Sequence, residues 1–279
     1  MAVNENLKKL VDQMPDPDSR RMFTKDMDKE KIERAVAEIF KGGAVNFQGL
    51  IDILGVPGSA ENVKPHYALH CVLNHALIVK DEKARKTFCE ILANALGGDY
   101  PDYTKAYFCQ ELQWAGRDEA LAALGRTLES DTLCDPAAMA LVTIGGDGAA
   151  DQLRRALPGA EGARRLTIIH SLAALADPKA AGDLEKALGD DDLEVRIAAG
   201  TGLAAIGDAR AVSALLKAAD GKSGWERIQA CKNCFVLAEN LVESGKASDA
   251  KKLYEAIAKW NGPQEQHLKE IAQKALASA

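Results

Sequence analysis

The histidine-rich stretch at residues 66–75 holds the residue types that could most directly do chemistry. Its sequence, HYALHCVLNH, places His66 and His70 four residues apart, followed by Cys71 and His75. On a helix, this spacing puts two imidazoles on one face, where they could share a metal ion. A stable site needs three or four ligands, and the His-Glu-x-x-His pattern is absent from the sequence. We therefore expect partly exposed helix histidines and no metal site.

The CKNC motif of Cys231 and Cys234 is a second candidate. A Cys-x-x-Cys pair can be redox-active or bind zinc, but either role needs a helix N-terminus or a second ligand pair nearby. The repeat described below aligns Cys234 with leucines and Cys231 with a small residue, so we interpret both thiols as core residues. The six cysteines are too scattered for a disulfide framework, and we expect them to be reduced.

Four basic residues recur at one position of successive predicted helices and form what we call the basic column: Arg126, Arg155, Lys186 and Lys217. Each follows a leucine by two residues, a rotation of about 200° that turns it toward solvent. In solenoids built from two-helix repeats, the second helix of each repeat usually lines the concave face. If these four helices are such second helices, the basic column could bind an acidic peptide or another anionic partner. The alternative, which we favour, is a solvated face neutralised by acidic neighbours such as Glu185.

Other chemical motifs are missing. The sequence has no Gly-rich phosphate loop after a strand, no nucleophile elbow and no Ser-His-Asp constellation. We therefore assign no catalytic residue and no cofactor.

Charge and hydropathy restrict the class of partner. The 279-residue chain has a net charge of -6, which disfavours a broad nucleic-acid interface. Its apolar runs are far shorter than the roughly 20 residues of a membrane span, and its N-terminal sequence lacks the apolar core of a secretory signal. We expect a cytoplasmic monomer without nucleic-acid or membrane contacts. The alternative is an exported form whose signal peptide has been removed.

The composition points to helices as the elements that position these residues. Hydrophobic residues make up 47% of the chain and aromatic residues only 5%, so Ala, Leu, Ile and Val supply most of the apolar content. Ala and Leu favour helices, and no stretch shows the alternation of a half-buried strand. The sequence predicts an all-α fold.

An internal repeat of about 31 residues organises the predicted helices. The stretch DLEVRIAAGTGLAAIGD, residues 192–208, matches the segments one period before and after it. Two aligned columns stand out: Arg165, Arg196 and Arg227, and the buried-type column of Leu172, Leu203 and Cys234. Two-helix units that cannot bury their apolar faces alone stack into a solenoid. The repeat predicts a right-handed α-solenoid, an α-α superhelix of stacked antiparallel helix pairs.

Polar residues and glycine mark the ends of the repeated helices. Asp177 and Asp208 suit N-caps, because a carboxylate accepts from the free N–H groups of a first helical turn. Gly207 suits a helix C-terminus. Arginines that recur once per repeat serve stacking better than catalysis. We predict a structural ladder of Arg165, Arg196, Arg227, Asp177 and Asp208.

Residues 177–220 resemble the short HEAT-like repeat, of the type also found in phycobilisome lyases. The matching residues are those of a D-x-x-V-R element and of the A-x-x-x-L-x-x-I-G-D run that follows it: Asp192, Val195, Arg196, Ala199, Leu203, Ile206, Gly207 and Asp208. The resemblance covers about residues 104–236. It implies an armadillo-like helical fold in which the Asp and Arg of this element tie adjacent repeats together.

The predicted organisation has four parts: a capping or extended segment (1–27), degenerate helical repeats (28–103), HEAT-like repeats (104–236) and a C-terminal cap (237–279). The cap resembles one tetratricopeptide repeat at Gly245, Ala250, Tyr254 and Pro263, although the Trp and Tyr positions of that family's first helix are not matched. One copy cannot form a peptide groove, so we interpret it as a terminal cap.

The function we expect is that of a non-catalytic scaffold that presents a concave surface to a protein or peptide. Two enzymatic alternatives follow from the resemblance: a bilin-lyase-like enzyme that holds a tetrapyrrole, and an enzyme like the alkylpurine DNA glycosylases. The second needs a basic, aromatic DNA cradle, whereas this chain is acidic and has only Trp114, Trp225 and Trp260.

Overall fold

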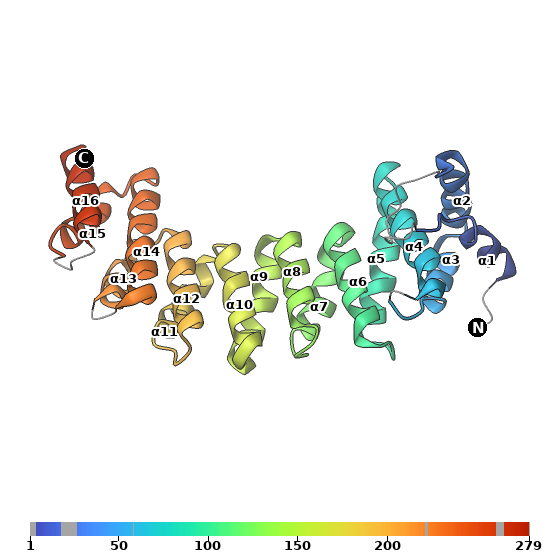
Figure 1. Ribbon diagram of the computed structural model, residues 1–279, viewed down its shortest axis with the longest axis horizontal. Coiled ribbons are helices and arrows are strands. Elements are labelled where there is room, and N and C mark those ends of the chain that lie inside the picture. Colours follow the sequence, from blue (N-terminus) through green and yellow to red (C-terminus); the bar gives the residue numbers. More distant parts are fainter. Residues whose placement is uncertain (1–3, 18–26, 58, 221–222, 261–264, 279) are drawn as a thin grey trace. The chain divides into compact units, whose positions relative to one another are not determined.

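The computed structural model describes residues 4–17, 27–57, 59–220, 223–260 and 265–278. Every regular element in these ranges is a helix: sixteen α-helices and three short 3-10 helices (Figure 1). The predicted all-α fold is confirmed. The chain divides into two compact units, residues 1–144 and 145–279.

Unit 1 consists of eight α-helices in its described residues: α1 (Glu5–Val11), α2 (Lys29–Lys41), α3 (Gly43–Asp52), α4 (Ala60–Ile78), α5 (Glu82–Leu96), α6 (Asp102–Ala115), α7 (Asp118–Thr127) and α8 (Cys134–Ile144). Helix α4 packs against α2, α3, α5 and α6, and α6 packs against α5 and α8. Aromatic rings fill the core below α4, where Phe47 and Phe88 stack with centroids 4.3 Å apart. The two stacked rings belong to α3 and α5, which both pack against α4.

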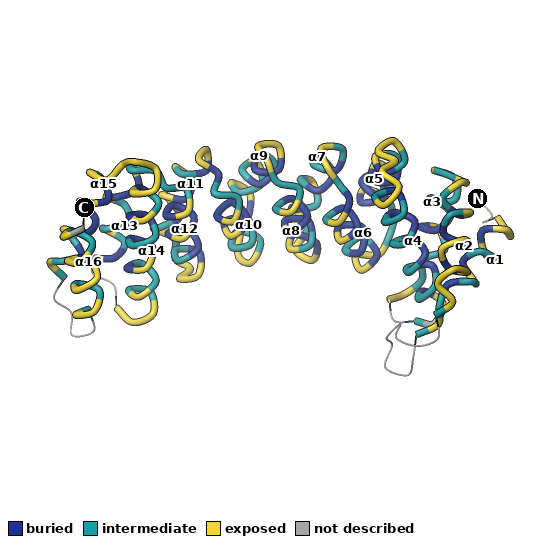
Figure 2. Tube along the Cα trace, turned by 90° about the horizontal axis from the view of Figure 1, so that it is seen from above, coloured by how far each residue is buried: buried dark blue, intermediate teal, exposed yellow. Residues whose placement is uncertain are grey.

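Unit 2 consists of α9 (Gly146–Ala156), η1 (Leu157–Gly159), α10 (Gly162–Ala174), η2 (Pro178–Ala180), α11 (Ala181–Ala187), α12 (Leu193–Ile206), η3 (Ala209–Ala211), α13 (Val212–Ala219), α14 (Gly224–Glu243), α15 (Ala247–Ile257) and α16 (Gln266–Ser278). Helices α10, α12 and α14 pack in a row, and α11 and α13 pack against α12 and α14 as a second layer. Buried positions recur along the helices, whereas the turns are mostly exposed (Figure 2). The predicted stacking of helix pairs is confirmed in this unit.

The predicted core column is confirmed. Leu172, Leu203 and Cys234 lie in α10, α12 and α14 and are at most 2% exposed. Small residues let these helices approach closely: a Cβ atom added to Gly202 would lie 3.0 Å from Ala173 Cβ in α10. The abundance of Ala and Gly in α12 therefore follows from its packing on both sides.

The predicted helix ends are also confirmed. Gly207 ends α12 in the left-handed conformation, with φ of 69°. The carboxylates of Asp177 and Asp208 accept from the backbone N–H groups of Lys179 and Arg210. Asp177 caps the 3-10 turn that leads into α11, and Asp208 caps the one that leads into α13. Such 3-10 turns are frequent at the N-termini of α-helices.

Candidate functional site

A pocket with a volume of about 630 Å³ lies on unit 1, where α4, α6 and α8 meet. The residues of its wall that matter below are His66, His70, Tyr107, Gln110, Glu111 and Trp114. A second hollow of about 260 Å³ shares His66, Tyr107 and Gln110 with it and reaches Tyr103. Together they form a continuous depression that we call the α4–α6 groove.

A hydrogen-bonded histidine–glutamate pair lines the pocket. His70 Nδ1 lies 3.0 and 3.1 Å from the two carboxylate oxygens of Glu111. Glu111 is only 3% exposed, whereas the His70 side chain is 45% exposed. A carboxylate only accepts hydrogen bonds, so in this contact Nδ1 carries the proton. The hydrogen bond to Glu111 raises the pKa of His70 above its ordinary value.

A stacked histidine–tyrosine pair also lines the pocket. The rings of His66 and Tyr107 stack with centroids 3.7 Å apart, and Tyr107 Oη donates to the His66 carbonyl at 2.9 Å. Burial lowers the pKa of His66 and raises the pKa of Tyr107. Both groups are therefore neutral near pH 7, and they give the pocket an aromatic, uncharged wall.

Exposed aromatic side chains border the α4–α6 groove. Trp114, on the last turn of α6, is 58% exposed, and its ring centroid lies 6.1 Å from that of His70. Tyr103, at the start of the same helix, is also exposed. The arrangement offers stacking faces, a fixed carboxylate and an imidazole nitrogen that can accept a proton or a hydrogen bond.

Most of this site was not predicted from the sequence. His66 and His70 were singled out, and they lie half-buried on α4 as expected, but Tyr107 and Glu111 were missed. The signal was present in α6, because Glu111 is the one charged residue at an inward position of that fully described helix. A carboxylate at such a position needs a buried partner.

The predicted basic column has exposed side chains at all four positions: Arg126, Arg155, Lys186 and Lys217. Arg155 Nη2 lies 2.9 Å from Asp151 Oδ2, and Lys186 Nζ lies 3.0 Å from Asp183 Oδ1. These aspartates belong to the same helices as their partners and reduce the local positive charge. Arg126 belongs to unit 1 and the other three residues to unit 2.

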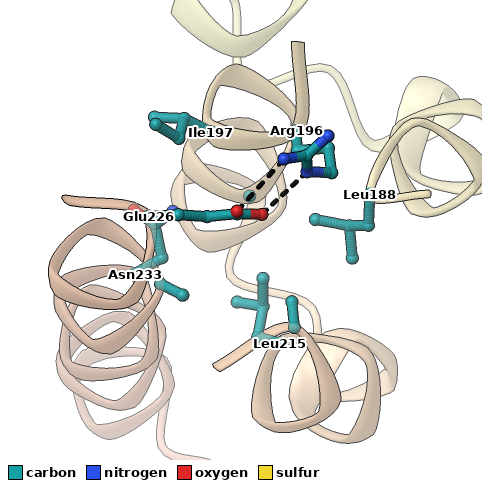
Figure 3. A pocket seen from close by; sticks show the side chains of 9 residues that line it. Leu188, Arg196, Ile197, Leu215, Glu226 and Asn233 are labelled. Carbon is teal, nitrogen blue, oxygen red and sulfur yellow. Dashed lines mark hydrogen bonds and ion pairs between the residues drawn. The ribbon is translucent and has the colours of Figure 1, made fainter. Parts of the chain in front are cut away.

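Arg196 of the predicted ladder joins two neighbouring first helices. Its Nε donates to Glu226 Oε1 at 2.7 Å, and its Nη1 donates to the Asp190 carbonyl oxygen at 2.7 Å. Figure 3 shows the guanidinium of Arg196 and the carboxylate of Glu226 facing each other between α12 and α14. Both side chains are mostly buried, so the charges are paired away from bulk water.

The other ladder arginines also reach acidic groups. Arg165 Nη2 lies 2.8 Å from Asp190 Oδ2. Arg227 Nε donates to Glu265 Oε1 at 2.7 Å, and its guanidinium carbon lies 4.5 Å from the centroid of the Trp260 ring.

The ladder aspartates pair differently from one another. Asp177 pairs with Arg154 of α9, from the preceding helix pair. Asp208 accepts from Arg210 Nε at 2.8 Å, within its own turn.

The CKNC thiols are core residues, as predicted. Cys231 and Cys234 are buried and free, and burial raises their pKa values to about 11 and about 12. In the described ranges, no three His, Cys, Asp or Glu side chains gather as a metal site would require. Of the cap residues, Ala250 and Tyr254 are buried, and Pro263 lies outside the described residues. No helix among the described residues is long and apolar enough to cross a membrane.

Comparisons with known proteins match residues 159–233 to the family of HEAT repeats. No curated protein matches the chain.

Solved structures that resemble the chain include an engineered protein, 18% identical over 98% of this chain and 78% of that one, with a TM-score of 0.43. The complex of CpcE and CpcF of phycocyanin lyase from Nostoc sp. PCC7120 is 17% identical over 90% of this chain and 94% of that one, with a TM-score of 0.37. A designed armadillo repeat protein in complex with the peptide (KR)4 is 21% identical over 98% and 99%, with a TM-score of 0.29.

The three likenesses are too distant to carry an argument about function. The sequence match and the stacked helix pairs of unit 2 agree with each other. The chain is a HEAT-like repeat protein, with HEAT repeats at residues 159–233.

Proposed function

We propose that this chain is a non-catalytic binding protein that holds a protein or peptide partner in the α4–α6 groove. The observation that carries the proposal is the exposed Trp114 beside a pocket of about 630 Å³. Tryptophan and tyrosine dominate binding energy at interfaces when they border a pocket that the partner can fill. The sequence led us to expect a scaffold with a concave binding surface, and this proposal assigns the binding site to one groove of unit 1.

The groove suits a peptide for two further reasons. Gln110 and Gln113 line it, and a side-chain amide can both donate to and accept from a peptide backbone. Its helices are held by a packed aromatic core, so little ordering is needed when the partner binds.

We also propose that the basic column is a solvated face and that the ladder residues hold the repeats together. The aspartate partners of Arg155 and Lys186 support the first role, and the pairing of Arg196 with Glu226 supports the second. A charge that is already paired on its own helix contributes little to binding an anionic partner.

Selection of peptides from a random displayed library on the wild-type protein tests the proposed function. The selected peptides are then titrated against Trp114→Ala and against Trp225→Ala, which removes an equally exposed tryptophan from unit 2. We expect Trp114→Ala to weaken binding at least about tenfold, as loss of a central aromatic side chain does. Trp225→Ala should leave affinity unchanged, and both variants should keep the wild-type helical circular dichroism.

Two outcomes of this experiment would contradict the proposals. Peptides that bind Trp114→Ala as tightly as wild type would place the binding surface elsewhere. The same peptides are also titrated against the double variant Lys186→Glu, Lys217→Glu, and loss of binding there would instead make the basic column the binding surface.

A further inference from the structure

The pocket of the α4–α6 groove is acidic and aromatic. Within the described part of the chain, Glu111 is the one carboxylate that lines it, and no lysine or arginine does. We propose that this pocket binds an arginine side chain of the partner peptide, with the guanidinium facing Glu111 and stacking on Trp114. The inference rests on the proposed function and specifies the residue that the groove recognises.

Burial gives Glu111 a strong field in the pocket. A carboxylate that is 3% exposed is little screened by water, so its attraction for a cation is greater than at the surface. Of the groups that hydrogen-bond to it, Tyr107 is uncharged, and the half-exposed His70 carries a full positive charge only when protonated. With His70 neutral, the site has an uncompensated negative charge that a cationic ligand would balance.

The aromatic wall favours a guanidinium over an ammonium group. Trp114 offers an exposed ring face, and the flat, weakly hydrated guanidinium stacks on such a face while it donates to a carboxylate. A lysine ammonium is compact and strongly hydrated, so it loses more hydration on entering the pocket.

The same chain already uses this combination inside unit 2. There, Arg227 lies 4.5 Å from the centroid of the Trp260 ring and donates to Glu265 at 2.7 Å. One guanidinium is thus held by a tryptophan face and a mostly buried glutamate. The α4–α6 groove places a tryptophan and a glutamate beside His70, with no arginine among its described lining residues.

Arginine binding and His70 protonation must compete, because both place a positive charge beside Glu111. The titratable groups that act on His70 are Glu111 from α6 and His66 on its own helix. Cys71 and Tyr107 stay uncharged, since burial raises the pKa of each. Arginine stays charged throughout, so its affinity should rise as the pH rises through the pKa of His70.

Calorimetric titration with a pair of synthetic peptides tests the inference. The probe is acetyl-Gly-Ser-Arg-Ser-Gly-amide, and its twin carries citrulline, which has the shape of arginine without the charge. We expect the arginine peptide to bind at least about tenfold more tightly than its twin, because carboxylate and ring face both favour the cation. The lysine peptide should bind between the two.

Variants locate the interaction. Glu111→Gln keeps the shape of the side chain and should abolish the preference for arginine over citrulline. Trp114→Ala should weaken the arginine peptide, whereas Trp225→Ala should not. The pH dependence in the wild-type protein provides the same test without any substitution that could disturb the fold.

Three results would overturn the inference: equal affinity for arginine and citrulline peptides, no binding of either, or affinity that rises as the pH falls. The last would indicate an anionic ligand held by protonated His70. If binding of the library-selected peptides requires Trp114 but does not require an arginine in the peptide, the proposed function stands and only this inference is refuted. Selected peptides that do not depend on Trp114 would remove the proposed function.

Discussion

The contact between α12 and its neighbours at Gly202 allows a quantitative test of the repeat packing. In the variant Gly202→Ala, the new Cβ atom would lie 2.8 Å from Leu184 Cδ1 and 3.2 Å from Ala173 Cα. Both distances are shorter than the roughly 3.5–4.0 Å of an ordinary carbon–carbon contact. The leucine methyl can rotate away, but Ala173 Cα is backbone, so α10 itself must shift.

The expected magnitude is a balance of two effects. Overpacking a close-packed interior costs about 1–3 kcal/mol. Replacing a helical glycine by alanine gains about 1 kcal/mol. Gly202→Ala should therefore lower the free energy of unfolding by up to about 2 kcal/mol.

Gly182→Ala is the matched control for this substitution. Gly182 lies in α11, and an added Cβ atom there would meet no atom within 4 Å. Only the helix-propensity gain remains, so this variant should be slightly stabilised, by at most about 1 kcal/mol. Urea unfolding followed by circular dichroism compares the two variants with wild type. A Gly202→Ala protein as stable as Gly182→Ala would refute the close approach of α10 and α12.

Three further predictions concern the core, the ladder and the pocket. Leu203→Ala should lower the free energy of unfolding by about 2–5 kcal/mol in the same assay, because its side chain is buried; a near-neutral effect would contradict that burial. Arg196→Met should lower the melting temperature more than Arg210→Met, since the first removes a mostly buried ion pair between two helices and the second removes an exposed, local pair. Equal decreases would argue against a tie between repeats. In an NMR titration, His70 should have a higher pKa than His66, because a glutamate hydrogen bond raises the first and burial lowers the second; the reverse order would mean that the glutamate contact is not formed in solution.

The periodic half of the fold could be predicted from the sequence because each repeat solves the same packing problem. One alignment of Leu172, Leu203 and Cys234 was enough to identify three buried positions, even though the third is a cysteine. The Gly207 stop and the two aspartate caps followed from local backbone chemistry, which depends on few neighbours.

The pocket could not be predicted in the same way. His70 and Glu111 are 41 residues apart, and the 31-residue period does not relate them. Their contact depends on how far α4 is displaced along α6, and that register is set by core packing rather than by a motif. Trp114 had no assigned role for the same reason, since it gains one only from its position beside His70.

The deeply buried cysteines have a consequence for how opening of the chain can be followed. Burial raises the pKa to about 12 for Cys89 and Cys109 in unit 1, and to about 11 and about 12 for Cys231 and Cys234 in unit 2. Alkylating reagents attack the thiolate, so these side chains react only when their helices transiently open. Pulsed alkylation followed by mass spectrometry would therefore measure the opening rate of each unit separately, from the rates at which its native thiols are alkylated.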